Sequence, residues 1–245
     1  LYDVVFSHSS YQTDTVFGVA LTNGNTTILN HQMFLLDSLS ISIQIKDVFS
    51  NNFLNNVEVV LQNNENIYIG NTDINGLVSF NSILPGNYQL YAGLWGYREY
   101  CDNISIQQST ITPILIEMES GYQDRFNTDQ GWVVTGNASS GLWSRGEPIV
   151  TFLSSDTINP GIDSYDCGPN AYVTGNFTGS ATIDDVDNGF TLLSSPIISL
   201  NPSLENRIFL KIWWKDISGT LLPNDSLVII VNDGVTKQVV FHALS

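Results

Sequence analysis

A short acidic loop around residue 185 is the part of the sequence whose residue types best suit a binding chemistry. It offers four oxygen-bearing side chains within five positions, and Ca²⁺ prefers carboxylate and amide oxygens supplied by a short loop. Clustered carboxylates also repel one another unless a cation neutralises them. We therefore expect a calcium site, with a solvated Asx-rich turn as the alternative. The expected ligands are Asp184, Asp185, Asp187 and Asn188.

The loop does not follow the EF-hand pattern. With Asp185 as the first ligand, the twelfth position holds Pro196 instead of the bidentate Glu of an EF-hand. The remaining ligands would have to come from other parts of the chain. The candidates for that role are Asp163, Asp166 and Asp225.

Tryptophan side chains are the second group that could bind a ligand, because an indole ring can stack on a sugar ring. Burial in a sandwich core is the alternative for such large apolar side chains. Trp213 and Trp214 are adjacent, so on a strand they would point to opposite faces, one into the core and one outward. The residues that we expect in a glycan site are Trp143 and Trp214.

Histidine and nucleophile patterns give no sign of catalysis. His8, His31 and His242 are scattered, and the chain contains neither His-Glu-x-x-His nor Gly-x-Ser-x-Gly. We therefore expect that this segment is not an enzyme.

Composition indicates folded β domains outside the cell. Hydrophobic residues make up 42% of the 245 residues and charged ones only 13%, with a net charge of -16. Such an acidic chain would be repelled by nucleic acid. No apolar run approaches 18 residues, so we expect no membrane span. In an oxidising compartment Cys101 and Cys167 could form a disulfide, and two separate buried thiols are the alternative.

An internal repeat organises the first half of the chain. The spacing from Tyr2 to Tyr11 recurs from Tyr88 to Tyr97, at an offset of 86, and Met33 matches Met118 at an offset of 85. A one-residue loop deletion explains the shorter offset. We therefore expect residues 1–37 to be the C-terminal part of a domain whose whole copy spans residues 38–119, in an array of similar modules.

The whole copy has the pattern of a β-sandwich. Apolar residues alternate with polar ones at Ile41, Ile43 and Ile45, and again from Val57 to Leu61, which is the period of half-buried strands. Residues 71–76 form a turn signal before the next apolar run. About seven short strands at this spacing predict a sandwich.

Residues 38–119 also resemble the carboxypeptidase regulatory-like domain, a transthyretin-like, seven-stranded sandwich found as a non-catalytic module in secreted and surface proteins. The partial copy departs from that family at Ser10-Tyr11, where Gly-Tyr is usual. The matching motifs are Ile43-Gln44-Ile45-Lys46-Asp47, Asn56-Val57-Glu58-Val59, Asn71-Thr72-Asp73-Ile74-Asn75-Gly76, Leu84-Pro85-Gly86-Asn87-Tyr88 and Gly96-Tyr97.

Residues 120–245 have a different texture, with Gly-rich loops, Trp and apolar runs at 208–214 and 227–231 that read as core strands. This region is similar to a MAM-like, concanavalin-type jelly roll of secreted bacterial peptidases and surface proteins. Such modules run on past residue 241, so we expect the jelly roll to be truncated at its C-terminus.

These observations predict an all-β chain: Ig/transthyretin-like β-sandwich repeats followed by a jelly-roll β-sandwich. We expect a secreted or cell-surface, non-catalytic accessory segment, in a parent that could be a metallopeptidase, providing spacing, calcium-dependent stability or binding. The alternatives are a structural, adhesive, fibre-forming segment and a glycan-binding module. Expected partners are other domains of the same chain, a surface glycan or protein, or copies of the chain itself, but not nucleic acid.

Overall fold

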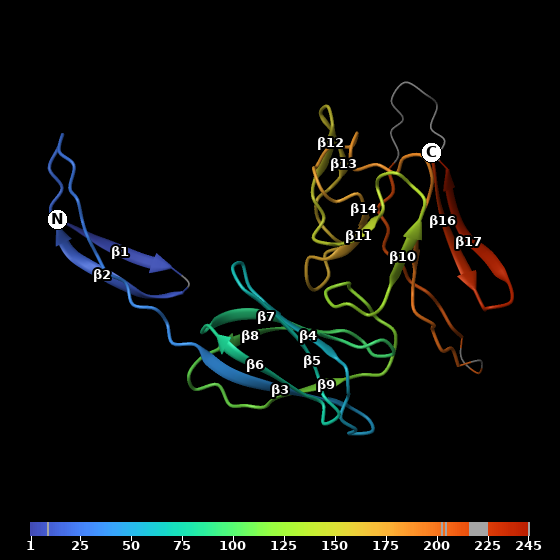
Figure 1. Ribbon diagram of the computed structural model, residues 1–245, viewed down its shortest axis with the longest axis horizontal. Helices are drawn as coiled ribbons and strands as arrows, with labels where there is room; N and C mark the ends of the chain where they lie inside the picture. Colours follow the sequence, from blue (N-terminus) through green and yellow to red (C-terminus); the bar gives the residue numbers. More distant parts are fainter. Residues whose placement is uncertain (9, 202, 204, 216–224, 245) are drawn as a thin grey trace. The chain divides into compact units, whose positions relative to one another are not determined.

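The computed structural model in Figure 1 describes residues 1–8, 10–201, 203, 205–215 and 225–244. Within those residues the protein has seventeen β-strands and no helix, which confirms the all-β prediction. The described residues accordingly include no helix able to cross a membrane. The chain divides into two compact units, Leu1–Asp124 with Thr128–Gln130 and Arg125–Asn127 with Gly131–Ser245.

Seven strands of the first unit form a β-sandwich, as the sequence predicts. One sheet has the order β6–β3–β9 and the other the order β5–β4–β7–β8. β9 pairs with β3 in parallel, whereas the other pairs are antiparallel. The strands are β3 (Leu39–Asp47), β4 (Glu58–Gln62), β5 (Ile67–Asn71), β6 (Leu77–Ile83), β7 (Gly86–Gly93), β8 (Tyr100–Ile106) and β9 (Ile114–Met118).

The core of the sandwich follows the alternation seen in the sequence. Ile43 and Ile45 of β3 and Leu61 of β4 are completely buried. They belong to one hydrophobic cluster that takes residues from both sheets. Burying each such side chain stabilises the folded chain by about 1.5–3 kcal/mol, so this cluster holds the two sheets together.

The turn between β5 and β6 lies where the sequence predicts it. Asp73 Oδ1 accepts hydrogen bonds from the N–H groups of Asn75, at 2.8 Å, and Leu77, at 2.9 Å. Gly76 has a φ of +68°, and a Cβ at this position would overlap the carbonyl oxygen of Ile45. The turn therefore requires glycine, both for its backbone conformation and for its close approach to β3.

Residues 1–37 form a separate antiparallel hairpin, β1 (Tyr2–His8) with β2 (Tyr11–Val19). Within the described part of the chain no other strand joins this two-stranded sheet. A third segment joins the start of β2, because the Gln12 N–H donates to the Phe34 carbonyl oxygen at 2.8 Å. The outer edge of β1 thus carries no strand in this part of the structure (Figure 1).

The hairpin pairs its residues as β7 and β8 do. Three consecutive pairs in β1–β2 correspond at an offset of 86 to three in β7–β8, and a bulge then shifts the pairing of Tyr2. The hairpin pairs are Val4 with Val16, Val5 with Thr15, and Phe6 with Asp14. The sandwich pairs are Leu90 with Asp102, Tyr91 with Cys101, and Ala92 with Tyr100.

The segment at residues 34–36 corresponds in the same way to residues 119–121. Its offset is 85, the same as the offset between Met33 and Met118. A bridge joins Tyr11 to Leu35 and another joins Tyr97 to Ser120. Two backbone hydrogen bonds match as well, and each pair has one common length. The Gln12 N–H donates to the Phe34 carbonyl oxygen at 2.8 Å, as the Arg98 N–H does to that of Glu119. The Leu36 N–H donates to the Ser10 carbonyl oxygen at 2.9 Å, as the Gly121 N–H does to that of Gly96.

A short stretch beyond residue 124 also belongs to the first unit. Thr128 is buried, and it lies so close to Gly93, at the end of β7, that a Cβ on Gly93 would overlap its side chain. The Asp129 N–H donates to Glu58 Oε2 at 2.5 Å. The chain therefore covers the end of β4 and β7 after the predicted boundary at residue 120.

The second unit consists of two-stranded antiparallel sheets. A jelly roll requires two larger sheets packed face to face. The jelly-roll fold of residues 120–245 therefore stays a prediction. The pairs are β10 (Val133–Gly136) with β15 (Thr191–Ser194), β11 (Trp143–Gly146) with β14 (Ala171–Thr174), β12 (Thr151–Leu153) with β13 (Asp156–Asn159), and β16 (Ser226–Asn232) with β17 (Lys237–Leu244).

The apolar run 208–214 is not a core strand, so that prediction is wrong. It has no strand pairing and most of its large apolar side chains are exposed. Side chains hold it instead: Trp213 Nε1 donates to the Ile158 carbonyl oxygen at 2.7 Å, and Lys215 Nζ donates to that of Thr157 at 2.7 Å. The run at 227–231 does form a strand, β16.

Neither cysteine is a free thiol, which removes the alternative of two separate buried thiols. Cys101 in β8 and Cys167 in the second unit are both disulfide-bonded.

Candidate functional site

The acidic loop of the second unit lies between β14 and β15, and Asp184 has a structural place in it. Asp184 is buried, and its carboxylate accepts hydrogen bonds from the backbone N–H of Thr178, at 2.9 Å, and Gly179, at 2.8 Å. It also accepts one from the Thr178 hydroxyl at 3.1 Å. Burial alone would raise the pKa of Asp184, but these hydrogen bonds lower it below its usual value. The carboxylate thus organises the turn at 177–180.

The next residues of the loop are held against residues 137–141. Ser140 Oγ donates to Asp187 Oδ2 at 3.2 Å and to the Asp185 carbonyl oxygen at 3.0 Å. Asn188 Nδ2 donates to Ser139 Oγ at 3.2 Å. Gly141 has a φ of +67°, and a Cβ there would overlap the Asp185 carbonyl oxygen. These contacts with residues 139–141 therefore fix the positions of Asp185 and Asp187 in the loop.

The sequence reasoning missed the two serines as supports of this loop. The only signal was the glycine at each end of the stretch, Gly136 and Gly141, which marked an irregular loop without saying what it would touch. Their hydroxyls find the acidic loop only when the chain is folded, because more than forty residues separate Ser139 and Ser140 from Asp185 and Asp187.

Electrostatic repulsion is concentrated on Asp185. Although its side chain remains exposed, partial desolvation raises the pKa of its carboxyl, and the negative charges of Asp187 and Asp225 raise that pKa further. The structure therefore brings Asp225, one of the additional candidates, into the electrostatic environment of the loop. Bound Ca²⁺ would relieve this repulsion.

The four expected ligands do not converge as a set. The carboxylate of Asp184 is turned toward the 177–180 backbone, and Asn188 bonds to Ser139. Across the described residues no group of three or more His, Cys, Asp or Glu side chains is arranged to hold a metal ion. Of the four expected ligands, only Asp185 and Asp187 are not committed to other partners in this way, so the residues present fit a calcium ion only in part, and the calcium site stays a prediction.

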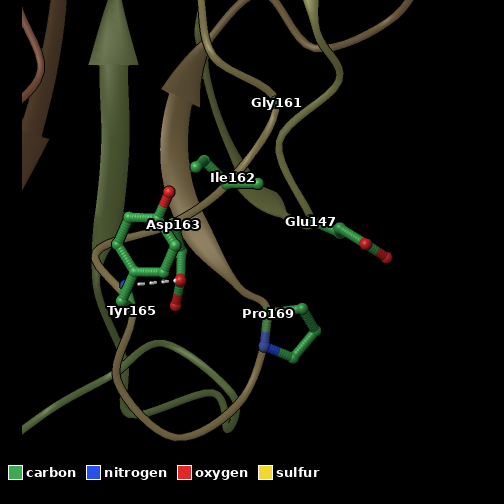
Figure 2. Close-up of a pocket in the computed structure, with 6 residues that line it drawn as sticks. All are labelled: Glu147, Gly161, Ile162, Asp163, Tyr165 and Pro169. Carbon is green, nitrogen blue, oxygen red and sulfur yellow. Dashed lines mark hydrogen bonds between the residues drawn. The ribbon is translucent and has the colours of Figure 1, made fainter.

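Asp163 and Asp166, the other additional candidates, belong to a different place. Asp163 lines a small pocket of about 140 Å³ together with Gly161, Ile162 and Pro169. Its Oδ1 accepts a hydrogen bond from the Tyr165 N–H at 2.9 Å, while Glu147 points its carboxylate away from it (Figure 2). Burial and the charge of Asp166 raise the pKa of Asp163. This pocket offers too little converging polar chemistry to define a ligand.

The tryptophans expected to bind a glycan are partly accessible. Trp143 begins β11 and is half-buried, and its backbone N–H donates a hydrogen bond to Thr191 Oγ1 at 3.1 Å. Trp213 is 63% exposed and Trp214 is 37% exposed, so the prediction that one of them is a core residue is wrong. Trp132 instead packs edge-on against Phe126. Glycan binding by Trp143 and Trp214 stays a prediction.

Comparisons with known proteins leave the family open. No protein-family model matches the chain, and no curated protein matches it. The carboxypeptidase regulatory-like and MAM-like resemblances therefore stay predictions.

Three solved structures are similar to parts of the chain, with low scores. They are a streptococcal ancillary pilin (TM-score 0.35, 11% identity, 47% of this chain and 39% of that one), the major pilin subunit of Bacillus cereus (0.30, 18%, 35% and 31%) and the pilus 2b backbone protein of group B streptococcus (0.30, 15%, 44% and 48%). This chain therefore covers less than half the length of each. Such TM-scores support no conclusion beyond the β-rich character that the strands already show.

Proposed function

We propose that this chain is a non-catalytic structural segment of an extracellular or cell-surface protein built from repeated β-sandwich modules. The observation that carries the proposal is the matched strand pairing of residues 1–37 and 86–121. A module that recurs with the same register is the mark of an array, in which each unit contacts its neighbours and the whole provides length and spacing. This reading favours the structural alternative over an accessory role beside a peptidase.

Charge and surface composition support the same proposal. A net charge of -16 keeps such an array soluble and discourages contact with nucleic acid. The sandwich has its own hydrophobic core, so it can keep its fold while its two ends are connected to other parts of a fibre or stalk.

Stretching single molecules between the two chain ends tests the structural role. With the disulfide reduced, so that residues beyond Cys101 can also extend, the sandwich from residue 38 to residue 121 should unfold in one discrete event that lengthens the chain by roughly 300 Å less the folded span, and it should refold on relaxation. A Leu90→Ala variant, which opens a cavity in the core, should reduce the unfolding force. Gradual lengthening with no discrete event would refute a structural module.

The location requires its own test. Antibodies raised against the folded chain should label intact, unpermeabilised cells that produce the protein, and external protease should remove that label. Labelling only after permeabilisation would contradict the extracellular assignment and leave the mechanical result unaffected.

A second candidate function is calcium-dependent stabilisation at Asp185 and Asp187, favoured by the repulsion that raises the pKa of Asp185. Ca²⁺ at 100 times its dissociation constant should stabilise the folded state by about 2.7 kcal/mol. Thermal unfolding with Ca²⁺ and with chelator measures this shift, which should disappear in an Asp185→Asn, Asp187→Asn variant.

Asp184→Asn is the matched control for the calcium experiment. It should lower the melting temperature equally with Ca²⁺ and with chelator, because Asp184 bonds to the 177–180 turn. If adding Ca²⁺ left the melting temperature of the parent chain unchanged, the loop would be a solvated turn and not a calcium site.

A further inference from the structure

Three asparagines of the chain are followed directly by glycine, and this step favours loss of the asparagine amide. Asparagine is a thermolabile residue. Because glycine has no side chain, its backbone nitrogen can approach Cγ of the preceding asparagine and displace the amide nitrogen. The reaction also needs a backbone that can move and a glycine nitrogen that no hydrogen bond holds. The three steps are Asn23-Gly24, Asn75-Gly76 and Asn188-Gly189.

The step at Asn75-Gly76 is held in the turn between β5 and β6. The Gly76 N–H, whose nitrogen would have to react, donates to the Asp73 carbonyl oxygen at 2.9 Å. The Asn75 N–H donates to Asp73 Oδ1 at 2.8 Å. Gly76 is also buried, close to the Ile45 carbonyl oxygen. Ring closure at this step therefore requires the turn to open first.

The step at Asn188-Gly189 is held by packing against another loop. Asn188 Nδ2 donates to Ser139 Oγ at 3.2 Å, which fixes the side chain that would react. A Cβ on Gly189 would overlap Asn137 Oδ1 and the backbone of Ala138. The backbone at this step thus has little room to form a five-membered ring.

The step at Asn23-Gly24 is open. The two residues lie at the tip of a turn that is closed by a hydrogen bond from the Asn25 N–H to the Thr22 carbonyl oxygen at 3.1 Å. Both are exposed, and nothing lies within 4 Å of a Cβ built on Gly24. Among the described residues, neither the Asn23 side chain nor the Gly24 N–H makes a hydrogen bond.

The complete sandwich contains the counterpart of this turn, and the counterpart is exposed as well. The Thr110 N–H donates to the Gln107 carbonyl oxygen at 2.9 Å, at an offset of 85 from the hydrogen bond that closes the turn at 22–25. Gln108 and Ser109 at its tip are exposed although all seven strands of the sandwich are in place. Strands that complete a sandwich around residues 1–37 would therefore leave the turn at 22–25 open.

We propose that Asn23 is a site of spontaneous deamidation, in which Gly24 supplies the attacking nitrogen and water is the co-reactant. The Gly24 nitrogen loses its proton and bonds to Cγ of Asn23, the Cγ–Nδ2 bond breaks, and ammonia leaves with that proton. Water then opens the cyclic succinimide. Hydrolysis at Cγ gives aspartate, and hydrolysis at the main-chain carbonyl gives isoaspartate. Either product adds a negative charge at the tip of the turn.

Incubation of the folded full chain at pH 8, followed by proteolysis and mass spectrometry, tests the proposal. Deamidation at Asn23 should be at least about tenfold faster than at Asn75 and Asn188, because reaction at those two steps requires prior local opening. Fragmentation that distinguishes the two products should find both aspartate and isoaspartate at position 23.

The chain unfolded in urea is the control for intrinsic reactivity, and there the three steps should react at similar rates. Asn23→Gln should remove the product at position 23 and leave the other two rates unchanged, because glutamine would have to form a less favourable six-membered ring. Asp73→Ala removes the carboxylate that holds the turn at 73–77. It should accelerate deamidation at Asn75 and leave the rate at Asn23 unchanged.

Three outcomes would overturn the proposal. The first is an equal or slower rate at Asn23 than at Asn75 or Asn188 in the folded chain. The second is no reaction at Asn23 under conditions in which the unfolded chain reacts there. The third is conversion of Asn23 to aspartate without isoaspartate, which would show direct hydrolysis in place of ring closure through Gly24.

Discussion

Residues 1–37 and residues 86–121 are two versions of one supersecondary unit, and within the described residues only the second of them pairs with further strands. Both pair their hairpin in the same register, and both attach a third segment through matching backbone hydrogen bonds. In the sandwich the unit is buried under β3, β4 and β6, while in residues 1–37 its apolar side chains stay largely exposed. The comparison separates what a local sequence specifies from what tertiary neighbours add.

The third segment shows the difference most clearly. Ile114–Met118 is a strand because it pairs in parallel with β3. The counterpart at residues 29–33 keeps an alternating half-buried pattern, with Phe6 stacked on His31 at 4.7 Å, yet it forms no strand. A strand requires a neighbour to accept and donate its backbone hydrogen bonds, so the same pattern gives a strand only where a partner is present.

The largest expected effect compares Leu90 with Val4, which occupy matching positions. Leu90→Ala should destabilise the sandwich by about 2–5 kcal/mol, because it leaves a cavity in a packed core. Val4→Ala should cost less than about 1 kcal/mol, because Val4 is only half-buried within the described residues. Chemical denaturation monitored by far-UV circular dichroism measures both. Equal costs would show that residues 1–37 already have a core of their own.

Two glycines with left-handed backbones give the next largest effect. Gly76→Ala should lower the free energy of unfolding by about 2–4 kcal/mol. The added methyl group would overlap the Ile45 carbonyl oxygen, and alanine is also unfavourable at this positive φ. Gly18 has a φ of +70° but nothing within 4 Å of the added group, so Gly18→Ala should cost only about 1 kcal/mol. Denaturant midpoints distinguish the two. A larger loss at Gly18 would reveal a neighbour packed against the hairpin.

The smallest effect concerns alkaline pH and the tyrosines at matching positions 88 and 2. Burial, and then the neighbouring Tyr68, raise the pKa of Tyr88 to about 12. Because the folded pKa exceeds the unfolded value near 10, the folded state loses stability as pH rises from about 10 to about 12. The loss is on the order of 1 kcal/mol at pH 11.

Tyr88→Phe should remove part of this alkaline loss, whereas Tyr2→Phe should leave the free energy of unfolding at pH 8 nearly unchanged, since Tyr2 is exposed. Urea titrations at pH 8 and pH 11 provide the comparison. If Tyr2→Phe lowered the free energy of unfolding at pH 8 more than Tyr88→Phe, the burial difference between the two regions would be contradicted.

Much of the first unit follows from the sequence because its signals are local. Alternating apolar residues around Ile43 and Val59 predicted the strands, and Asp73 with Gly76 predicted the turn, since side-chain hydrogen bonding and a positive φ depend on neighbouring residues alone. The offset between Tyr2 and Tyr88 likewise anticipated a repeat whose backbone pairing could then be compared residue by residue.

The candidate site was harder to predict because its decisive contacts are distant in sequence. Nothing in the run from Asp184 to Asn188 distinguishes the carboxylate that bonds to the turn at 177–180 from the carboxylates held by Ser140 or near Asp225. The apolar run at 208–214 failed for a related reason. Its hydrophobicity indicated a strand, but without a pairing strand it is held by side chains instead.

By itself, then, the sequence determined the all-β class, the strand period, the turn at residues 71–76 and the repeat, because each depends on interactions within a few residues or on copying of the same pattern. Only the tertiary structure decided that Thr128 returns to the end of β7 and that Asp184 is committed to its own loop. Those features depend on which strands and loops come together in space, and a linear pattern of residue types does not specify its neighbours.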